Sequence, residues 1–135
     1  MIVVDTNLIA YLWLPGEHTK LAEEVLRKDP QWAAPSLWRS EFRSVLAGYI
    51  RLKKMPLDTA IHIMDEAETL FQGREYFVPS LKILELIPHT PCSAYDLEFI
   101  ALAKDLGGVL VTTDKQVIKA FPALAVSALS FLSKH

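Results

Sequence analysis

Four acidic residues have the positions and the chemistry to form one site, although they are spread over the whole chain: Asp5, Glu41, Asp96 and Asp114. Asp5 and Asp114 each follow a short apolar run, where a strand is expected to pass into a helix. Asp96 follows Ser93 by three residues, which is close to the spacing of a capping box. An aspartate at such a place can simply cap a helix N-terminus, so each of the three has a structural explanation when taken alone.

Glu41 cannot be explained by capping because it lies inside a predicted helix. On a helical wheel it falls at the margin of the apolar stripe, with Ser44 and Gly48 on its side of the helix. These small residues leave room for a ligand above the backbone. Arg39 and Arg43 project from nearly the opposite side, so neither is expected to pair with Glu41. The alternative is a glutamate at the core boundary that extends into water.

The joint placement of the acids favours a metal site. The carboxyl ends of parallel strands share one edge of a sheet, where ligands bind, so Asp5 and Asp114 are expected there together. Asp96 joins them if its helix packs beside that edge. Two unit charges 4 Å apart repel by about 4 kcal/mol at an effective dielectric of 20, so converging carboxylates need protons or a counter-cation. Oxygen ligands favour Mg²⁺ or Mn²⁺.

Zinc is disfavoured, because the four histidines and the single cysteine show no zinc-ligand spacing. A divalent cation held by carboxylates suits phosphodiester hydrolysis. It lowers the pKa of bound water and stabilises charge on the attacking and leaving oxygens.

The elements that must position these acids alternate along the chain. Strands are predicted at 2–4, 32–35, 76–78, 109–111 and, at the sheet edge, 125–126. Helices are predicted after Asp5, at about 18–28, in a long segment capped by Ser36, at 57–71, 81–87 and 97–106, and in a short segment ending at Phe121. The helix at 97–106 is apolar on most sides and should be buried. This alternation predicts the α/β class, with a parallel sheet covered by helices on both faces.

Size and composition limit the class of protein. With 135 residues, 51% hydrophobic and 22% charged, the chain is expected to fold as one domain over 1–135. A net charge of −2 argues against a strongly basic protein that coats a duplex. The start lacks the features of a signal peptide, and no apolar stretch is long enough to span a membrane. The lone Cys92 favours a reducing compartment, so a cytoplasmic protein is expected.

Four sequence blocks, in order and across essentially the whole chain, resemble the PIN-domain nucleases. They are Ile2-Val3-Val4-Asp5-Thr6-Asn7, Glu41-Phe42 after Pro35-Ser36, Ser93-Ala94-Tyr95-Asp96 with Ala101-Leu102-Ala103, and Leu110-Val111-Thr112-Thr113-Asp114. Within that family the chain is most similar to VapC-type ribonuclease toxins of toxin–antitoxin pairs. The Asp-Thr-Asn block alone is a weak signal, but the four blocks together are a strong one.

The resemblance implies a three-layer α/β/α sandwich around a mostly parallel sheet, with Mg²⁺ or Mn²⁺ in an acidic pocket. Asp5 and Asp96 would be the most direct metal ligands, often through water, while Glu41 and Asp114 would hold further waters or a second ion. Asn7 and Thr112 match polar positions that support the cluster by hydrogen bonding. Family members commonly form homodimers, and a cognate antitoxin occupies the active-site groove, where its arginine would neutralise the acids.

The sequence therefore predicts a divalent-metal-dependent endoribonuclease, in which an activated water attacks the RNA phosphorus and leaves a 5′-phosphate and a 3′-hydroxyl. The main alternative is a PIN-like partner-binding or regulatory module with negligible turnover. A phosphotransfer domain is less well supported, because Asp5 has Asn7 rather than a second aspartate two residues on. A metal-free ribonuclease using His18 or His89 also remains open.

RNA contacts have less specific candidates. Arg51, Lys53 and Lys54 form a basic cluster after the long helix, although such charges also complement a helix C-terminus. The tryptophans Trp13, Trp32 and Trp38 could stack on bases, but two of them occupy apolar periodic positions that favour core packing. Cys92 is expected to be chemically inert.

Overall fold

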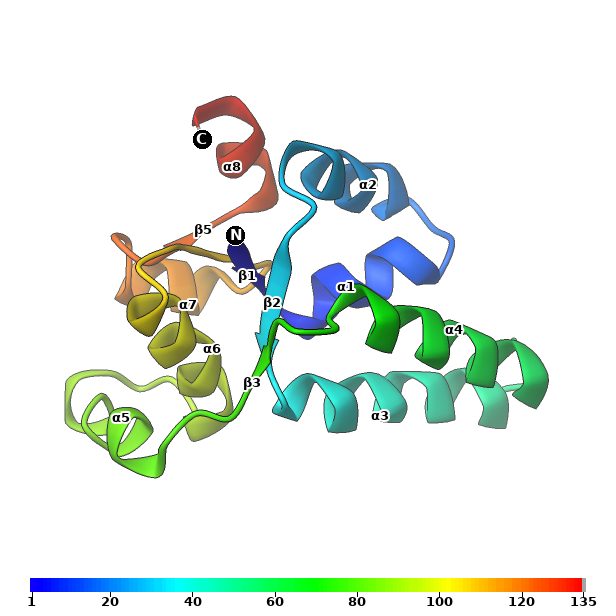
Figure 1. Ribbon diagram of the computed structural model, residues 1–135, viewed down its shortest axis with the longest axis horizontal. Coiled ribbons are helices and arrows are strands. Elements are labelled where there is room, and N and C mark those ends of the chain that lie inside the picture. Colours follow the sequence, from blue (N-terminus) through cyan, green and yellow to red (C-terminus); the bar gives the residue numbers. More distant parts are fainter. Residues whose placement is uncertain (135) are drawn as a thin grey trace.

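The computed structural model describes residues 1–134 and shows an α/β fold built on one parallel sheet (Figure 1). Its strands are β1 (Ile2–Val4), β2 (Trp32–Pro35), β3 (Glu75–Tyr76), β4 (Leu110–Val111) and β5 (Ala125–Val126). Their spatial order is β3-β2-β1-β4-β5, so β1 is central and β5 forms an edge as predicted. Every pair of neighbouring strands is parallel, which brings their carboxyl ends to the same edge.

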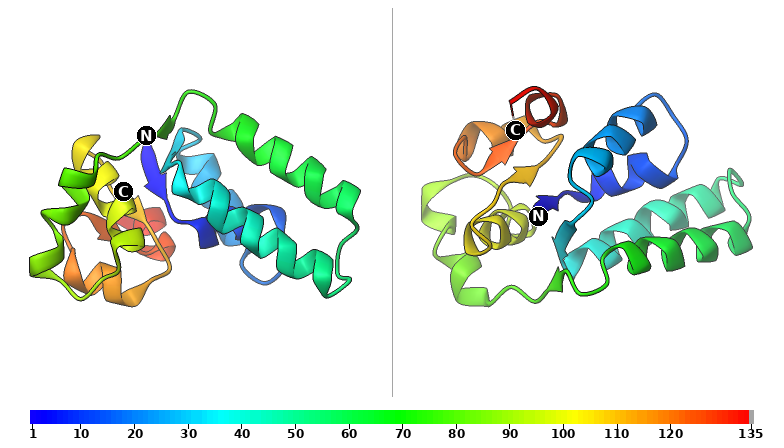
Figure 2. Two further views of the ribbon diagram at one scale, coloured as in Figure 1. Left: turned by 90° about the horizontal axis from the view of Figure 1, so that it is seen from below. Right: turned by 45° about the horizontal axis from the view of Figure 1, so that its top comes forward.

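Helices connect the strands and cover both faces of the sheet (Figure 2). They are α1 (Thr6–Trp13), α2 (Thr19–Lys28), α3 (Leu37–Arg51), α4 (Leu57–Leu70), α5 (Ser80–Leu84), the 3₁₀ turn η1 (Ile87–His89), α6 (Ala94–Asp105), α7 (Lys115–Ala120) and α8 (Ala128–Lys134). Within residues 1–134, none of these helices combines the length and apolar character needed to cross a lipid bilayer. Because helices cover both faces of the parallel sheet, the predicted three-layer α/β/α architecture is confirmed.

Alternate residues of the strands enter two separate cores, as the period of two in a strand requires. Ile2 and Val4 of β1 belong to one core, whereas Val3 between them belongs to the other. The first core lies against α1 to α4 and α8, and the second is built mainly from α6. Both faces of β1 are thus buried, which explains its uninterrupted β-branched sequence.

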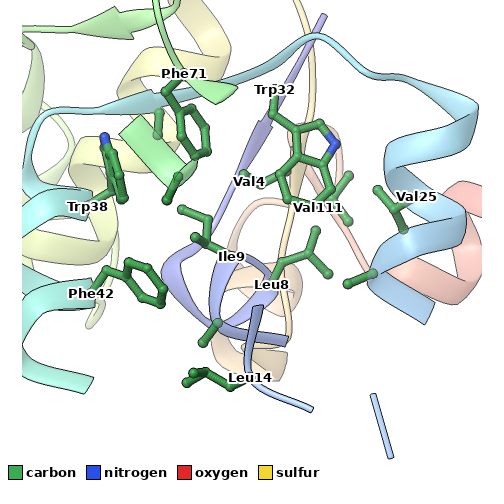
Figure 3. Packing of buried hydrophobic residues seen from close by; sticks show 14 of the residues in the cluster. Val4, Leu8, Ile9, Leu14, Val25, Trp32, Trp38, Phe42, Phe71 and Val111 are labelled. Atoms are coloured by element: carbon green, nitrogen blue, oxygen red, sulfur yellow. The ribbon is translucent and has the colours of Figure 1, made fainter. Parts of the chain in front are cut away.

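Large aromatic side chains fill the first core. Trp32, Trp38 and Phe42 are fully buried, and Figure 3 shows Ile9 of α1 between Trp38 and Phe42 of α3 and Val4 of β1. The rings of Trp38 and Phe71 lie 4.8 Å apart, so α3 packs against the end of α4. The expectation that two of the three tryptophans serve the core is confirmed for Trp32 and Trp38.

The second core depends on α6, whose residues Leu97, Ile100 and Ala103 are completely buried. This confirms the prediction from its nearly uniform apolar sequence. Burial on several sides places the helix in close contact with β1, β2 and β4. The N-terminal turn of α6, which carries Asp96, is thereby held at a defined place relative to the sheet.

Three local predictions were wrong. The third strand is Glu75–Tyr76 rather than 76–78, because β2 passes into α3 directly after Pro35 and leaves later residues without a pairing strand. The helix predicted at 81–87 ends at Leu84, and the 3₁₀ turn that follows contains Pro88, which lacks an N–H and cannot continue an α-helix. Ser36 precedes α3 but makes no side-chain capping bond, because its backbone is already helical.

Candidate active site

The structure brings the four predicted acids to one cavity of about 130 Å³ at the carboxyl edge of the sheet. We call it the acidic cavity; its polar lining residues are Asp5, Thr6, Asn7, Glu41, Asp96, Thr112 and Asp114. The acids come from four different elements: the β1–α1 junction, the middle of α3, the first turn of α6 and the β4–α7 junction. Glu41 and Asp96 reach the cavity because α3 and α6 pack on opposite faces of the sheet beside its central strands.

Asp5 is held by hydrogen bonds to both of its carboxylate oxygens. Its Oδ1 accepts from the Leu8 N–H at 2.9 Å and so caps α1. Its Oδ2 accepts from the Thr112 hydroxyl at 2.6 Å and from the Thr113 N–H at 2.9 Å. These two bonds span 107 and 108 residues and follow from the parallel pairing of Val4 with Val111, which sets the two strand ends side by side.

Burial raises the pKa of the Asp5 carboxyl above its ordinary value of 3.8, although the hydrogen bonds from Thr112, Thr113 and Leu8 oppose that shift. Donors directed at both oxygens stabilise the ionised form, whereas the loss of solvent destabilises it. Asp5 is therefore a fixed carboxyl whose ionised form is disfavoured by burial and favoured by its hydrogen-bond donors.

Asp96 and Asp114 both lie at the beginnings of helices. The Asp114 Oδ1 accepts from the N–H groups of Gln116 and Val117 at 2.9 and 3.2 Å, so this residue caps α7 as predicted. Asp96 is placed differently, because the Ser93 Oγ caps α6 by accepting from the Asp96 N–H at 3.1 Å. The side chain of Asp96 is thus not the capping group, and it lines the acidic cavity.

Glu41 receives a hydrogen bond from a buried threonine that the sequence analysis missed. The Thr6 hydroxyl donates to the Glu41 Oε1 at 2.7 Å. Burial is the largest cause of a raised pKa at Glu41; the Thr6 hydrogen bond lowers it, and the charges of Asp96 and Asp5 raise it further. This electrostatic coupling agrees with the common position of the acids around one cavity.

A fifth carboxylate, Glu98, also belongs to this electrostatic environment. Its pKa is raised by burial and by the charge of Glu41. Its position two residues after Asp96 gave no motif that could have identified it. Thr6 could have been identified from the sequence, because it directly follows Asp5 in the Asp-Thr-Asn block. It is the first residue of α1, which packs against α3.

Asn7 and Thr112 are the predicted supporting residues. Thr112 lies in the loop between β4 and α7, and Asn7 contacts that loop. The Thr112 hydroxyl donates to Asp5 and accepts from the Asp114 N–H at 3.1 Å, so it joins two of the acids. The Asn7 Nδ2 donates to the Thr113 Oγ1 at 3.1 Å. Thr113, which was not among the predicted site residues, thus connects Asn7 to the Asp5 carboxylate.

The donor set fits a hard cation that is bound partly through water. The lining of the acidic cavity contains four carboxylates, and none of its described residues is Lys, Arg or His. In residues 1–134 no three His, Cys, Asp or Glu side chains form a ready-made direct ligand cluster. This arrangement is compatible with Mg²⁺, which commonly keeps several waters and takes one or two carboxylates from the protein. It does not suit structural zinc, which takes four protein ligands.

Comparisons with known proteins agree with the fold and with the motifs. A family model described as PIN domain matches residues 2–123. The chain is 29% identical over 126 residues to Ribonuclease VapC3 of Pyrobaculum aerophilum, an alignment that covers 91% of this chain and 96% of that protein.

Two solved structures share the fold. PAE2754 from Pyrobaculum aerophilum has a TM-score of 0.75 and 19% identity, with 97% of this chain and 92% of that chain covered. FitAcB from Neisseria gonorrhoeae has a TM-score of 0.72 and 17% identity, with 96% and 99% covered. The family model spans most of the sequence and agrees with the four motif blocks, so the chain belongs to the PIN-domain family and resembles its VapC-type members.

Proposed function

We propose that residues 1–135 act as a single nuclease domain, a divalent-metal-dependent endoribonuclease that is the toxin of a toxin–antitoxin pair. The observation that carries this proposal is the acidic cavity, where four carboxylates converge without a basic side chain in its described lining. Membership of the PIN-domain family and similarity to a protein named Ribonuclease VapC3 support RNA as the substrate.

In this proposal Asp5 and Asp96 hold Mg²⁺, or Mn²⁺ in its place, while Glu41 and Asp114 hold further waters. When bound, the cation supplies charge stabilisation for the phosphodiester and lowers the pKa of coordinated water. Asn7 and Thr112 keep the Asp5 carboxylate and the β4–α7 loop in place through their hydrogen bonds. The protein thus contributes a rigid set of oxygens at the sheet edge.

Glu41 is the acid best suited to proton exchange. Its Oε1 accepts from Thr6, which leaves Oε2 to take up or release a proton. Because its pKa is raised, this carboxyl titrates closer to neutral pH than an ordinary glutamate. General acid–base catalysis is most efficient when the pKa of the group lies near the working pH.

The first test is cleavage of a mixed pool of structured RNAs by the purified protein, with Mg²⁺ or Mn²⁺ and with EDTA. Asp96→Asn is the best inactivating variant, because the Ser93 cap uses the backbone of Asp96 and survives the change. Asp5→Ala would also remove the cap of α1 and so confuse stability with activity. Asp65→Asn, an exposed acid on α4, is the matched control.

Loss of cleavage with EDTA and in Asp96→Asn, with retention in Asp65→Asn, would support the proposal. Cleavage that persists in EDTA would contradict the metal dependence and favour histidine chemistry. Silence of the folded protein in every condition would favour the partner-binding module.

The proposal includes two protein contacts. A cognate antitoxin would occupy the acidic cavity, where the guanidinium of an arginine could replace the cation. A homodimer is supported by exposed apolar side chains around α5, namely Phe77, Leu81 and Leu84. Sedimentation of the wild-type protein and of Leu81→Glu would test this interface, with a monomeric variant as the expected result.

A further inference from the structure

A second cavity, of about 270 Å³, adjoins the acidic cavity. We call it the aromatic cavity; its main lining residues are Asn7, Tyr11, Leu14, His18, Val45 and Tyr49. Asn7 lines both cavities, so the two hollows border the same residue. None of the catalytic roles proposed above uses Tyr11, His18 or Tyr49.

Helices α1 and α3 each supply lining residues to both cavities. On α1, Asn7 and Tyr11 are four residues apart and share a face. On α3, Glu41, Val45 and Tyr49 repeat at the same interval. The two helices pack together (Figure 2), so these two rows form a track that begins at the carboxylates and ends among aromatic rings. At 1.5 Å per residue, Tyr49 lies about 12 Å along α3 from Glu41.

The rings in this cavity are already positioned and partly accessible. The ring centroids of Tyr11 and His18 lie 4.6 Å apart with an interplanar angle of 34°. Tyr11 and Tyr49 are half-buried, and their inner edges pack against the first core. Packing fixes each ring while leaving part of it at the surface, which reduces the entropy lost when a flat ligand stacks on it.

The charges around the cavity are mixed. The Lys54 Nζ lies 5.8 Å from the centroid of the Tyr49 ring, at the end of the track away from the acids. Glu17 is exposed and its Oε1 lies 3.3 Å from the His18 Nε2. A cation beside an aromatic ring is suited to a nucleotide, whose phosphate and base need both features. The exposed carboxylate of Glu17 opposes that binding.

We propose that the aromatic cavity binds a nucleobase of single-stranded RNA, beside the phosphodiester that the acidic cavity holds. The proposal rests on the nuclease function proposed above. Unpaired bases are typically bound by stacking on aromatic side chains, which tolerates different base identities. Tyr11, His18 and Tyr49 would supply the stacking surface, the Asn7 amide would contact the nucleotide at the junction, and Lys54 would bind the next phosphate.

The test measures binding of a fluorescein-labelled single-stranded RNA of roughly eight nucleotides to full-length protein by fluorescence anisotropy. Tyr11→Leu and Tyr49→Leu keep apolar bulk against the core but lose the ring, whereas Tyr11→Phe and Tyr49→Phe keep the ring. Phe121→Leu is the matched control, since Phe121 is a half-buried aromatic beside the second core that lines neither cavity. Melting temperatures establish that each variant is folded.

Stacking on an aromatic ring contributes about 1–3 kcal/mol per base, so each leucine variant should weaken RNA binding by about five-fold or more. The phenylalanine variants and Phe121→Leu should bind nearly as tightly as the wild type. An abasic nucleotide scanned along the RNA should reduce affinity strongly at one position. At that position the loss should not add to the loss in Tyr11→Leu, because both changes remove the same contact.

Unchanged affinity in folded leucine variants, fully additive losses, or no RNA binding by the wild type would overturn the proposal. So would leucine variants that lose only a protein partner, because the cavity would then be a protein-docking site. Cleavage assays on the same samples separate this proposal from the nuclease proposal. RNA binding that depends on the rings, without metal-dependent cleavage, would support the base site and contradict the nuclease proposal. Metal-dependent cleavage together with RNA binding that does not depend on the rings would contradict the base site and support the nuclease proposal.

Discussion

Single side chains at the candidate site both hold the fold together and line the acidic cavity. Asp5 caps α1 through Oδ1 and holds the β4–α7 loop through Oδ2, so its carboxylate is fixed by the same bonds that join two elements. Its role as a helix cap is therefore compatible with the metal-binding role proposed for it. Glu41 receives a hydrogen bond from Thr6, the residue that follows Asp5 in the sequence. Thr6 is buried, and its hydroxyl donates to the Glu41 Oε1.

Replacing Thr6 with valine tests that dependence, because valine keeps the shape and removes the donor. The Thr6 hydrogen bond lowers the pKa of Glu41, so Thr6→Val should raise that pKa further. We expect the acidic limb of the pH–rate profile for RNA cleavage to move to higher pH. Activity on this limb should fall roughly tenfold, the effect of losing one hydrogen bond to a charged group.

The control for this variant is Thr59→Val, an exposed threonine on α4. It should leave both the profile and the maximal rate unchanged. A profile that stays in place in folded Thr6→Val would show that Glu41 does not titrate in the reaction.

At the scale of elements, the beginnings of α1, α6 and α7 orient the aspartates. The capping groups are Asp5, Ser93 and Asp114, each of which accepts from a backbone N–H two or three residues ahead. These bonds satisfy N–H groups that have no partner inside the helix. The chain therefore places its acids where helix ends meet the carboxyl edge of the sheet.

Ser93 and Ser36 each precede a helix, but only Ser93 makes a side-chain capping bond. Comparing the two therefore measures the effect of the cap on stability. Ser93→Ala removes the cap of α6 and should lower the free energy of unfolding by about 1 kcal/mol. Ser36→Ala, before α3, should have little effect because Ser36 makes no side-chain capping bond. Urea denaturation of both variants measures the difference. Equal losses would contradict the capping geometry of the structure.

A second prediction at this scale concerns Arg39, which joins α3 to α4 and β3. Its guanidinium pairs with Glu68 and with Glu75, and this contact holds the pKa of Glu75 below its usual value. Arg39 is 39% exposed, so solvent screens these pairs. We expect Arg39→Leu to lower the free energy of unfolding by up to about 1 kcal/mol, less so at high salt. Salt-independent destabilisation would instead indicate lost packing.

At the scale of the whole molecule, we expect an acidic cluster inside a nearly neutral protein to make the stability depend on pH and on divalent cations. The net charge is only −2, yet three carboxyls near the acidic cavity, Asp5, Glu41 and Glu98, have raised pKa values. Each of them favours the folded state most when protonated. Their stabilising contribution is complete below the unfolded pKa values and is lost as the pH rises through the folded ones.

Metal-free protein should therefore become more stable as the pH falls from neutral toward the ordinary glutamate value of 4.5. Below that value Glu75 has the opposite effect, because its lowered pKa makes its stabilising contribution disappear as it is protonated. Melting temperatures in EDTA across this range measure the slope. Glu41→Gln should flatten it, and a melting temperature that falls steadily on mild acidification would contradict the raised pKa values.

A divalent cation should oppose this loss of stability at neutral pH, where the carboxylates are ionised and bind it best. Binding at 100 times the dissociation constant stabilises a protein by about 2.7 kcal/mol, which corresponds to a rise of several degrees in the melting temperature. Mg²⁺ should give such a rise in the wild type at neutral pH, and a smaller one in acid, where protons compete for the carboxylates. Asp96→Asn should respond weakly. An equal response in both proteins would place the cation elsewhere.

The sequence by itself determined the features that depend on neighbouring residues. Alternating strands and helices, the burial of α6, and the caps at Asp5, Ser93 and Asp114 follow from apolar periodicity and from side chains that bond two or three residues ahead. The shared edge of Asp5 and Asp114 followed as well, because parallel strands align their carboxyl ends. Glu41 and Asp96 were candidates from their places in the predicted helices, and the four family motifs supported them as partners of the two strand-end aspartates.

Only the tertiary structure decided which distant groups meet. The Thr6–Glu41 bond depends on how α1 packs against α3, and the electrostatic influence of Glu41 on Glu98 depends on how α3 and α6 flank the sheet. The aromatic cavity likewise joins Tyr11, His18 and Tyr49 from separate segments. Residue spacing specifies one face of one element, whereas the distance between two elements is set by the side chains buried between them.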